Sequence, residues 1–361
     1  MEYGFVKVAS AVPTVKVADC RHNAGQMAEM IADAANQNVE IIIFPELSIT
    51  GYTCGDLFAQ SVLLEEAEKS LEWLVAETQS LPVISIVGIP HPHNGSLINA
   101  AVVFQSGKIL GVVPKTFLPN YKEFYEKRWF ASALQTPECV TSICGQRVPM
   151  QRDMLFATSN TTFGVEICED LWSTIPPSSF LSLEGAEIVF NMSADNDCVG
   201  KHSYLRNLVK QQSARCIAGY VFSSCGFGES TTDVVFAGTS IICDNGSTIA
   251  EGERFAMDRR MTVGEIDVES IRNDRRVNTT FAESRGLHSP PPRPSRHDRR
   301  FAADSVSTQS DKNRQPSPVC AVRLQTRFLL RRDFRHPIHR IGTTVCPHAC
   351  GTSRNRHLRR S

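Results

Sequence analysis

Three short segments of the chain each place one reactive side chain at or just beyond a predicted strand. Glu46 lies in the segment FPEL, Lys115 in PKTFLP and Cys168 in VEICED. A carboxylate, an ammonium group and a thiol that come together can cleave an amide. The thiol is mostly protonated near neutral pH, because the ordinary pKa of cysteine is about 8.5. Glu46 could therefore take the thiol proton as a general base, and later activate the water that releases the acyl group.

The same chemistry also produces negative charge on the carbonyl oxygen and on the sulfur. Lys115, together with the backbone N–H that follows Cys168, could hold the charge that develops on the carbonyl oxygen. A nearby lysine also favours the thiolate. Taken singly, each residue has a simpler interpretation, because cysteine is often a buried packing residue and a Glu or Lys at a strand end usually faces solvent. The prediction depends on the three segments together.

Apolar patterning predicts that helices and strands alternate along the part of the chain that contains these residues. Helical spacing is found over residues 18–38, 63–80 and 200–218. Strands are expected over residues 39–44, 83–89, 162–168, 187–191 and 218–224, and hairpins pair 97–104 with 108–114 and 234–243 with 247–255. The second hairpin turns at Asp244-Asn245-Gly246. This order predicts an α/β layered domain with its reactive residues at strand ends.

The composition changes sharply after Arg285. The 361 residues include 38 basic and 38 acidic side chains, but residues 286–361 hold fifteen Arg and one Lys against four Asp, which leaves 22 basic and 34 acidic residues in 1–285. The later segment is rich in Arg, Pro, Ser and His and largely lacks apolar periodicity. We expect a catalytic domain over residues 1–285, followed by an Arg/Pro-rich tail over 286–361 that is disordered or a frame-shifted reading of the gene. No folded nucleic-acid motif accompanies the basic residues, so no nucleic-acid partner is expected.

Several other classes of protein are disfavoured. No apolar run approaches the ~20 residues that span a bilayer, so no membrane partner is expected. The N-terminus lacks a signal-peptide pattern. Twelve cysteines without a repeating spacing indicate reduced thiols and a cytoplasmic protein. In the tail, His336, His339, Cys346 and Cys350 do not follow a usual zinc-site order, so no metal site is expected.

The three reactive segments, in this order, resemble the Glu–Lys–Cys triad of the nitrilase superfamily of carbon–nitrogen hydrolases. Three longer stretches are similar to the N-terminal glutaminase domain of glutamine-dependent NAD synthetases: LPNYKEFYEKRWF from Leu118, EICEDLW from Glu166 and YVFSSCGFGESTTDVVFAG from Tyr220. The resemblance covers about residues 4–285. It implies a four-layer α-β-β-α sandwich, a symmetric homo-oligomer, and hydrolysis of glutamine to glutamate and ammonia through a Cys thioester, with no cofactor.

The resemblance also assigns catalytic roles. Glu46 corresponds to the base of the family, Lys115 to its oxyanion stabiliser and Cys168 to its nucleophile. Glu126 is similar to a second active-site glutamate that fixes the lysine. Glu123 is an alternative for that role, because the sequence alone leaves open which of the two carboxylates points inward.

A glutamine pocket is implied as well, drawn from Tyr121, Phe124, Glu169 and Lys201. A free amino acid offers an ammonium group to Glu169 and a carboxylate to Lys201, so both substrate charges can be matched. Asp195 is a departure, because the family usually has a serine there. A carboxylate at this position could repel the substrate carboxylate or help to bind its ammonium group, and the sequence does not decide between the two.

The second domain of the synthetases binds ATP and deamido-NAD, and its SGGxDS signature does not occur in this sequence. No GxxxxGK[ST] or GxGxxG motif occurs either. We expect that the chain does not make NAD alone, and that ATP and Mg²⁺ would belong to a separate synthetase domain. Two alternatives stay open, namely a carbon–nitrogen hydrolase that acts on another amide or a nitrile, and a catalytically idle oligomeric fragment.

Overall fold

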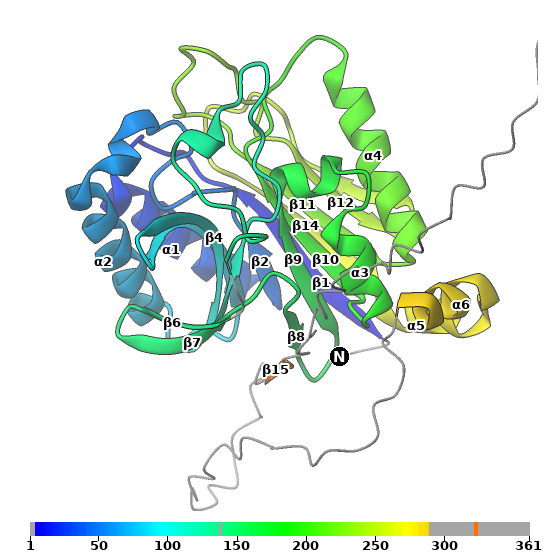
Figure 1. The fold of residues 1–361 in the computed structure, drawn as a ribbon. Helices are drawn as coiled ribbons and strands as arrows, with labels where there is room; N and C mark the ends of the chain where they lie inside the picture. The colour runs from blue at the N-terminus through cyan, green and yellow to red at the C-terminus, as the bar shows by residue number, and fades with distance from the viewer. Residues whose placement is uncertain (1–3, 137–138, 289–320, 324–361) are drawn as a thin grey trace, which may run out of the picture. The chain divides into compact units, whose positions relative to one another are not determined.

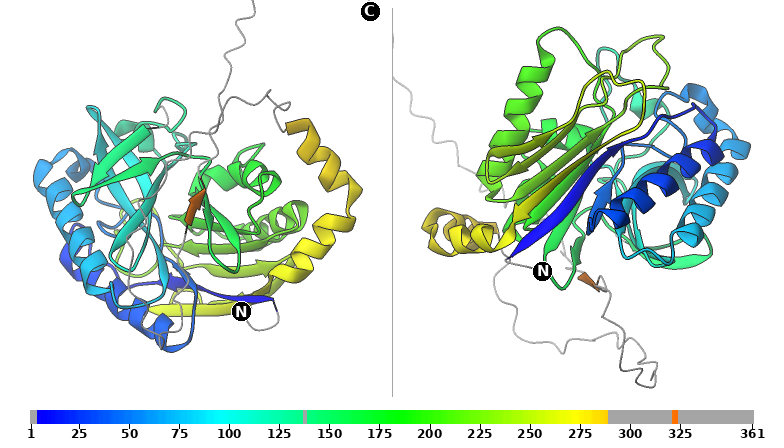
Figure 2. Two further views of the ribbon diagram at one scale, coloured as in Figure 1. Left: turned by 90° about the horizontal axis from the view of Figure 1, so that it is seen from below. Right: turned by 180° about the vertical axis from the view of Figure 1, so that it is seen from behind.

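Two β-sheets pack face to face, and helices cover the outer face of each sheet (Figure 1). The computed structural model describes residues 4–136, 139–288 and 321–323. In the right-hand view of Figure 2, the blue helices α1 and α2 lie on one side of the paired sheets and the green helix α4 lies on the other. The four-layer α-β-β-α sandwich that the resemblance implied is therefore confirmed.

The first sheet has the strand order β14-β1-β2-β3-β4-β5-β7-β6. Strand β1 pairs in parallel with β2 and antiparallel with β14, so strands near the two ends of residues 4–288 lie side by side. The bounds are β1 Phe5–Val12, β2 Ile41–Ile43, β3 Ile84–His93, β4 Ser96–Gln105, β5 Lys108–Pro114, β6 Cys139–Ile143, β7 Gln146–Met150 and β14 Arg260–Asp267.

The second sheet has the order β13-β12-β11-β10-β9-β8-β15. Its central strands β9, β10 and β11 run parallel, and β11 to β13 are antiparallel. The bounds are β8 Leu155–Ala157, β9 Thr162–Ile167, β10 Ile188–Ser193, β11 Gly219–Ser224, β12 Ser240–Asp244, β13 Ser247–Glu251 and β15 Ala321–Arg323. Strand β15 pairs antiparallel with β8.

The helices follow from capping and apolar spacing. In α1, the Asp19 side chain accepts a hydrogen bond from the backbone N–H of His22, which caps the first turn, and buried residues recur at helical spacing behind it. The α-helices are α1 Cys20–Asn36, α2 Ser61–Glu77, α3 Pro177–Leu183, α4 Lys201–Cys216, α5 Val268–Val277 and α6 Thr279–His288. Short 3₁₀ turns occupy Gly55–Ala59 (η1), Glu126–Arg128 (η2) and Cys168–Trp172 (η3).

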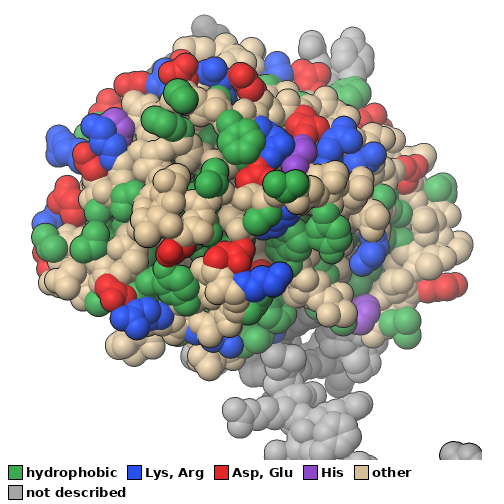
Figure 3. All heavy atoms as spheres, turned by 90° about the horizontal axis from the view of Figure 1, so that it is seen from above, with side chains coloured by type: hydrophobic (Ala, Val, Ile, Leu, Met, Phe, Trp, Pro, Cys, Tyr) green, Lys and Arg blue, Asp and Glu red, His purple; other side chains and the backbone are tan. Residues whose placement is uncertain are grey.

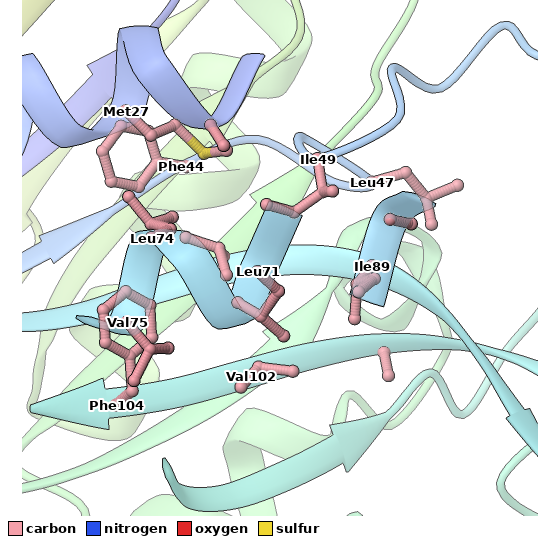
Figure 4. Packing of buried hydrophobic residues seen from close by; sticks show 14 of the residues in the cluster. Met27, Phe44, Leu47, Ile49, Leu71, Leu74, Val75, Ile89, Val102 and Phe104 are labelled. Carbon is pink, nitrogen blue, oxygen red and sulfur yellow. The ribbon is translucent and has the colours of Figure 1, made fainter. Parts of the chain in front are cut away.

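The apolar core is divided by the layers. Figure 4 shows α1 and α2 packed on the first sheet, where Met27 lies beside Phe44, and Leu71 faces Val102. A second cluster lies between the sheets and includes stacked aromatic rings of Phe156 and Phe163, whose centroids are 5.2 Å apart. Both sheets are thus fixed on two sides, which makes the strand ends rigid supports for a site.

Most predicted elements lie within a few residues of the observed ones, but both strands of the second hairpin were predicted too long. The expected strand over 234–243 begins only at Ser240, and the one over 247–255 ends at Glu251. Residues 234–239 form a loop with one isolated bridge, between Phe236 and Asn196. The side chain of Phe236 is buried against Ala194 and Cys225, so the apolar run is satisfied without a strand.

The predicted tail reaches the described part of the chain only at its start, where α6 continues to His288, and at β15. The four His and Cys residues considered for zinc lie outside the described residues. Within residues 4–136, 139–288 and 321–323, no helix is both long and apolar enough to cross a membrane.

Candidate active site

The three predicted reactive residues follow three strand ends. Glu46 lies just after β2, Lys115 directly after β5, and Cys168 directly after β9. Since β2 and β9 belong to different sheets, the site lies across the interface of the sandwich. A backbone hydrogen bond of 3.2 Å from the Glu46 N–H to the Ser193 carbonyl joins the two sheets beside it.

Lys115 is the centre of a buried network of charges. Its Nζ donates to Glu46 Oε1 at 2.6 Å and to both oxygens of Glu126 at 2.8 and 2.9 Å. None of the three side chains is more than 1% exposed. Burial alone would lower the pKa of Lys115, but the negative charges of Glu126 and Glu46 outweigh it and raise this pKa well above its ordinary value. Lys115 is therefore a fixed positive charge.

The two oxygens of Glu46 have different surroundings. Oε1 accepts from Lys115 and from Asn99 Nδ2, the latter at 2.6 Å. Oε2 is buried and has no hydrogen-bond partner among the residues that the structure describes. One oxygen is thus held by donors, whereas the other can accept a proton. Asn99 was not predicted, although its place on β4 beside the Lys115 strand is a signal that strand pairing would have given.

Glu126, rather than Glu123, contacts the lysine. Its Oε1 also accepts from the Tyr52 hydroxyl at 2.8 Å. Burial raises the pKa of Glu126 to about 7, and the charge of Lys115 opposes this rise. Glu123 instead accepts from Asn196 Nδ2 at 2.6 Å. The structure thereby distinguishes the two carboxylates that the sequence left open.

Cys168 occupies a bend between β9 and η3. Its φ of 47° is in the left-handed region, which is unfavourable for a residue with a Cβ and is typical of functional sites. Burial and the charge of Glu46 raise the pKa of the Cys168 thiol well above its ordinary value, and Lys115 acts in the opposite direction. Lys115 thus lowers the pKa of the thiol, as expected, but burial and Glu46 raise this pKa by more. The resting thiol is protonated and needs a base.

A buried carboxylate that the sequence analysis missed connects two of the three segments. Asp170 accepts from the backbone N–H groups of Thr116 at 3.2 Å, Phe117 at 2.8 Å and Ile167 at 3.0 Å. Burial raises the pKa of Asp170, whereas the amides of Ile167 and Phe117 lower it. Asp170 is the third residue of the turn that begins at Cys168, where an acidic side chain often caps the backbone, and this spacing could have indicated it.

The predicted pocket residues line one cavity. Its volume is about 500 Å³, and its walls include Cys168, Trp172, Tyr204 and the predicted residues Tyr121, Phe124, Glu169, Asp195 and Lys201. Figure 3 shows the face that is uppermost in Figure 1, where acidic, basic and hydrophobic side chains are mixed. A substrate in this cavity would meet the thiol together with charged groups of both signs.

The pocket residues also contact one another. The Tyr121 hydroxyl donates to Glu169 Oε1 at 2.9 Å, and the rings of Tyr121 and Phe124 meet edge to face with centroids 6.4 Å apart. Burial raises the pKa of Glu169. Lys201 pairs with Asp195 at 2.6 Å. The carboxylate of Asp195 thus pairs with the pocket lysine, and the two roles considered for it toward a substrate stay predictions.

No cluster of three or more His, Cys, Asp or Glu side chains suited to a metal ion occurs within residues 4–136, 139–288 and 321–323. The groups that converge on the cavity are a thiol, carboxylates, ammonium groups and aromatic rings. This set is suited to cleavage of a carbon–nitrogen bond by a thiol nucleophile with a carboxylate base.

Comparisons with known proteins agree with this geometry. The family described as carbon-nitrogen hydrolase matches residues 7–276. The glutamine-dependent NAD(+) synthetase of Mycobacterium tuberculosis (strain H37Rv) is 37% identical over 290 residues, which are 80% of this chain and 43% of that protein. The human glutamine-dependent NAD(+) synthetase is 27% identical and covers 80% of this chain and 42% of its own length.

Solved structures give the same result. The glutamine-dependent NAD(+) synthetase of Cytophaga hutchinsonii has a TM-score of 0.66 at 26% identity, over 73% of this chain and 43% of that one. A carbon-nitrogen hydrolase of Helicobacter pylori has a TM-score of 0.63 at 19% identity, over 80% and 97%, and shows the shared fold alone. The chain spans about two fifths of the length of the curated relatives that it matches.

Proposed function

Because this chain belongs to the carbon–nitrogen hydrolase family, we propose that it hydrolyses the side-chain amide of glutamine to glutamate and ammonia. The observation that supports this substrate most directly is that Cys168, Glu169 and Lys201 line the same cavity. The thiol would meet the amide, while the two charged residues would meet the ammonium and carboxylate groups of the amino acid. The relatives above are named as glutamine-dependent, which supports glutamine over another amide or a nitrile.

In the first step, Glu46 Oε2 takes the Sγ proton of Cys168 while the sulfur attacks the amide carbon. The carbonyl oxygen becomes an oxyanion, which Lys115 and the backbone N–H of Glu169 would stabilise. The protonated Glu46 then gives its proton to the amide nitrogen. The carbon–nitrogen bond breaks, ammonia leaves, and a thioester to Cys168 remains.

In the second step, water attacks the thioester. Glu46 takes a proton from the water, and the carbon–sulfur bond breaks to give glutamate and the thiolate, which regains the proton from Glu46. A single carboxyl group, whose side chain is fully buried, thus serves both half-reactions. Glu126 would keep Lys115 in place, because it binds the same Nζ with both oxygens.

The test is ammonia release from glutamine by the purified chain, beside Cys168→Ala. Cys243→Ala is the matched control, because Cys243 is also a buried cysteine but lies on β12 and contacts Thr248 instead of the site. We expect release by the wild type and by Cys243→Ala, and none by Cys168→Ala. Release that survives in Cys168→Ala, or its absence in a folded wild type, would contradict the proposal.

The partners of the chain are part of the same proposal. Ammonia from this site would be consumed by a separate synthetase domain, to which ATP and Mg²⁺ would bind, and the chain would act as a homo-oligomer in the cytoplasm. The nine cysteines whose structure is described are all free thiols, which suits a reducing compartment. Size-exclusion chromatography with light scattering measures the oligomeric state, and a monomer would remove that part of the proposal.

A further inference from the structure

Lys201 is the pocket cation that would meet the substrate carboxylate, and most of its hydrogen-bond donors already have partners in the protein. Its Nζ lies 2.6 Å from Asp195 Oδ1 and donates to Asn196 Oδ1 at 2.6 Å. It also lies 5.3 Å from the centre of the Trp172 ring and 6.0 Å from that of Phe124. An ammonium group has three hydrogens to donate, so at most one is left for a substrate.

The carboxylate of Asp195 also offsets the positive charge of Lys201. The Asp195 side chain is 8% exposed and that of Lys201 is 22% exposed, so solvent screens their attraction only in part. Burial raises the pKa of Asp195 to about 6, and Asp197 and Glu169 add negative charge near it. A substrate carboxylate that approached Lys201 would be attracted by its ammonium group and repelled by the Asp195 carboxylate beside it.

We propose that Asp195 determines specificity by competing with the substrate carboxylate for Lys201. This inference rests on the proposed function and concerns the same cavity. Charged residues that line the cavity are acidic at Glu123, Glu169 and Asp195, and basic at Lys122 and Lys201. Glu169 can accept the ammonium end of an amino-acid amide, whereas the pairing of Asp195 with Lys201 disfavours its carboxylate end.

Three amides that differ only at the end remote from the scissile bond separate these two contributions. Glutamine carries both the ammonium and the carboxylate, glutaramate carries only the carboxylate, and 4-aminobutanamide carries only the ammonium. The wild type should have a lower KM for 4-aminobutanamide than for glutaramate. The reactive amide is the same in all three, so differences in KM report on the pocket.

The deciding variant is Asp195→Asn, which keeps the size of the side chain and an oxygen acceptor for Lys201 but removes its charge. We expect KM to fall about tenfold for glutamine and for glutaramate, to stay within twofold for 4-aminobutanamide, and kcat to change little for all three. Asp197→Asn is the matched control, because Asp197 is also acidic and two residues away but pairs with Arg254. It should leave all three KM values within twofold. A second variant, Asp195→Ser, gives the same test if Asp195→Asn does not fold.

The outcomes separate this inference from the proposed function. If glutamine is hydrolysed but KM for glutaramate is unchanged in Asp195→Asn and Asp195→Ser, the inference is overturned and the proposed function stands. An equal fall in KM for 4-aminobutanamide would overturn it as well, because the effect would then not depend on a carboxylate. If neither the wild type nor the variants release ammonia from glutamine or glutaramate, while 4-aminobutanamide is hydrolysed, glutamine is not the substrate and the proposed function fails.

Discussion

Replacing Asp170 by Asn should destabilise the protein by about 3 kcal/mol. Both oxygens of Asp170 accept backbone N–H groups, and the side chain is 2% exposed. Asn offers one oxygen and one NH₂ group, so at least one amide loses its acceptor and faces a donor instead. A hydrogen bond contributes about 0.5–1.5 kcal/mol net, and a buried N–H left without an acceptor costs about 1–3 kcal/mol more.

Urea unfolding at pH 7 measures the change. Glu169→Gln is the control for stability, because Glu169 is the neighbouring residue of the same turn but is only partly buried, and its carboxylate accepts from the Tyr121 hydroxyl rather than from backbone N–H groups. We expect less than about 1 kcal/mol for this control, because the Gln carbonyl can still accept that hydrogen bond. A loss below about 1 kcal/mol in Asp170→Asn would refute the argument that the carboxylate holds the Lys115 segment against the Cys168 turn.

Three further results are expected. Glu46→Gln should abolish ammonia release yet shift the alkylation of Cys168 by iodoacetamide to lower pH, because the charge of Glu46 raises the pKa of the thiol; an unchanged pH profile would contradict this. Lys115→Met should cost about 3–5 kcal/mol in urea unfolding, because it leaves two buried carboxylates without their cation; a loss below about 1 kcal/mol would count against it. Burial raises the pKa of Asp195 to about 6, so its ionisation destabilises the folded state as pH rises from about 4 to about 6. Asp195→Asn should therefore gain up to about 3 kcal/mol relative to the wild type across that window, because each tenfold change in proton affinity corresponds to about 1.4 kcal/mol, and parallel stability curves would contradict it.

The sequence predicted the elements whose apolar pattern is local. Helix α1 and the hairpin of β4 and β5 lie close to their predicted ranges, since both follow from spacing and turn residues. Strand β1 was not predicted, because it is buried along most of its length and so lacks the alternation of a half-buried strand. Strand β14 was not predicted either. It is half-buried at nearly every position and so lacks alternation, and its pairing with β1 joins residues at opposite ends of the domain.

The site shows the same division. Glu46, Lys115 and Cys168 could be predicted because each stands at or just beyond a strand end and the three segments together resemble the Glu–Lys–Cys triad of the nitrilase superfamily. Most of the contacts that support them could not be predicted, because those contacts join residues far apart in the sequence. Asp170 binds backbone amides 53 and 54 residues away, and Asn99 donates to Glu46, 53 residues away. Periodicity carries no information about such pairs.

The central claim is that Cys168 attacks an amide to form a thioester, and trapping that thioester tests it most directly. The wild-type chain would be mixed with glutamine, quenched in acid within one turnover, digested and analysed by mass spectrometry. The account predicts a glutamyl adduct on the peptide that contains Cys168, together with one equivalent of ammonia released before the adduct is hydrolysed. Ammonia released with no adduct on Cys168 at any quench time, or an adduct on a different cysteine, would contradict it.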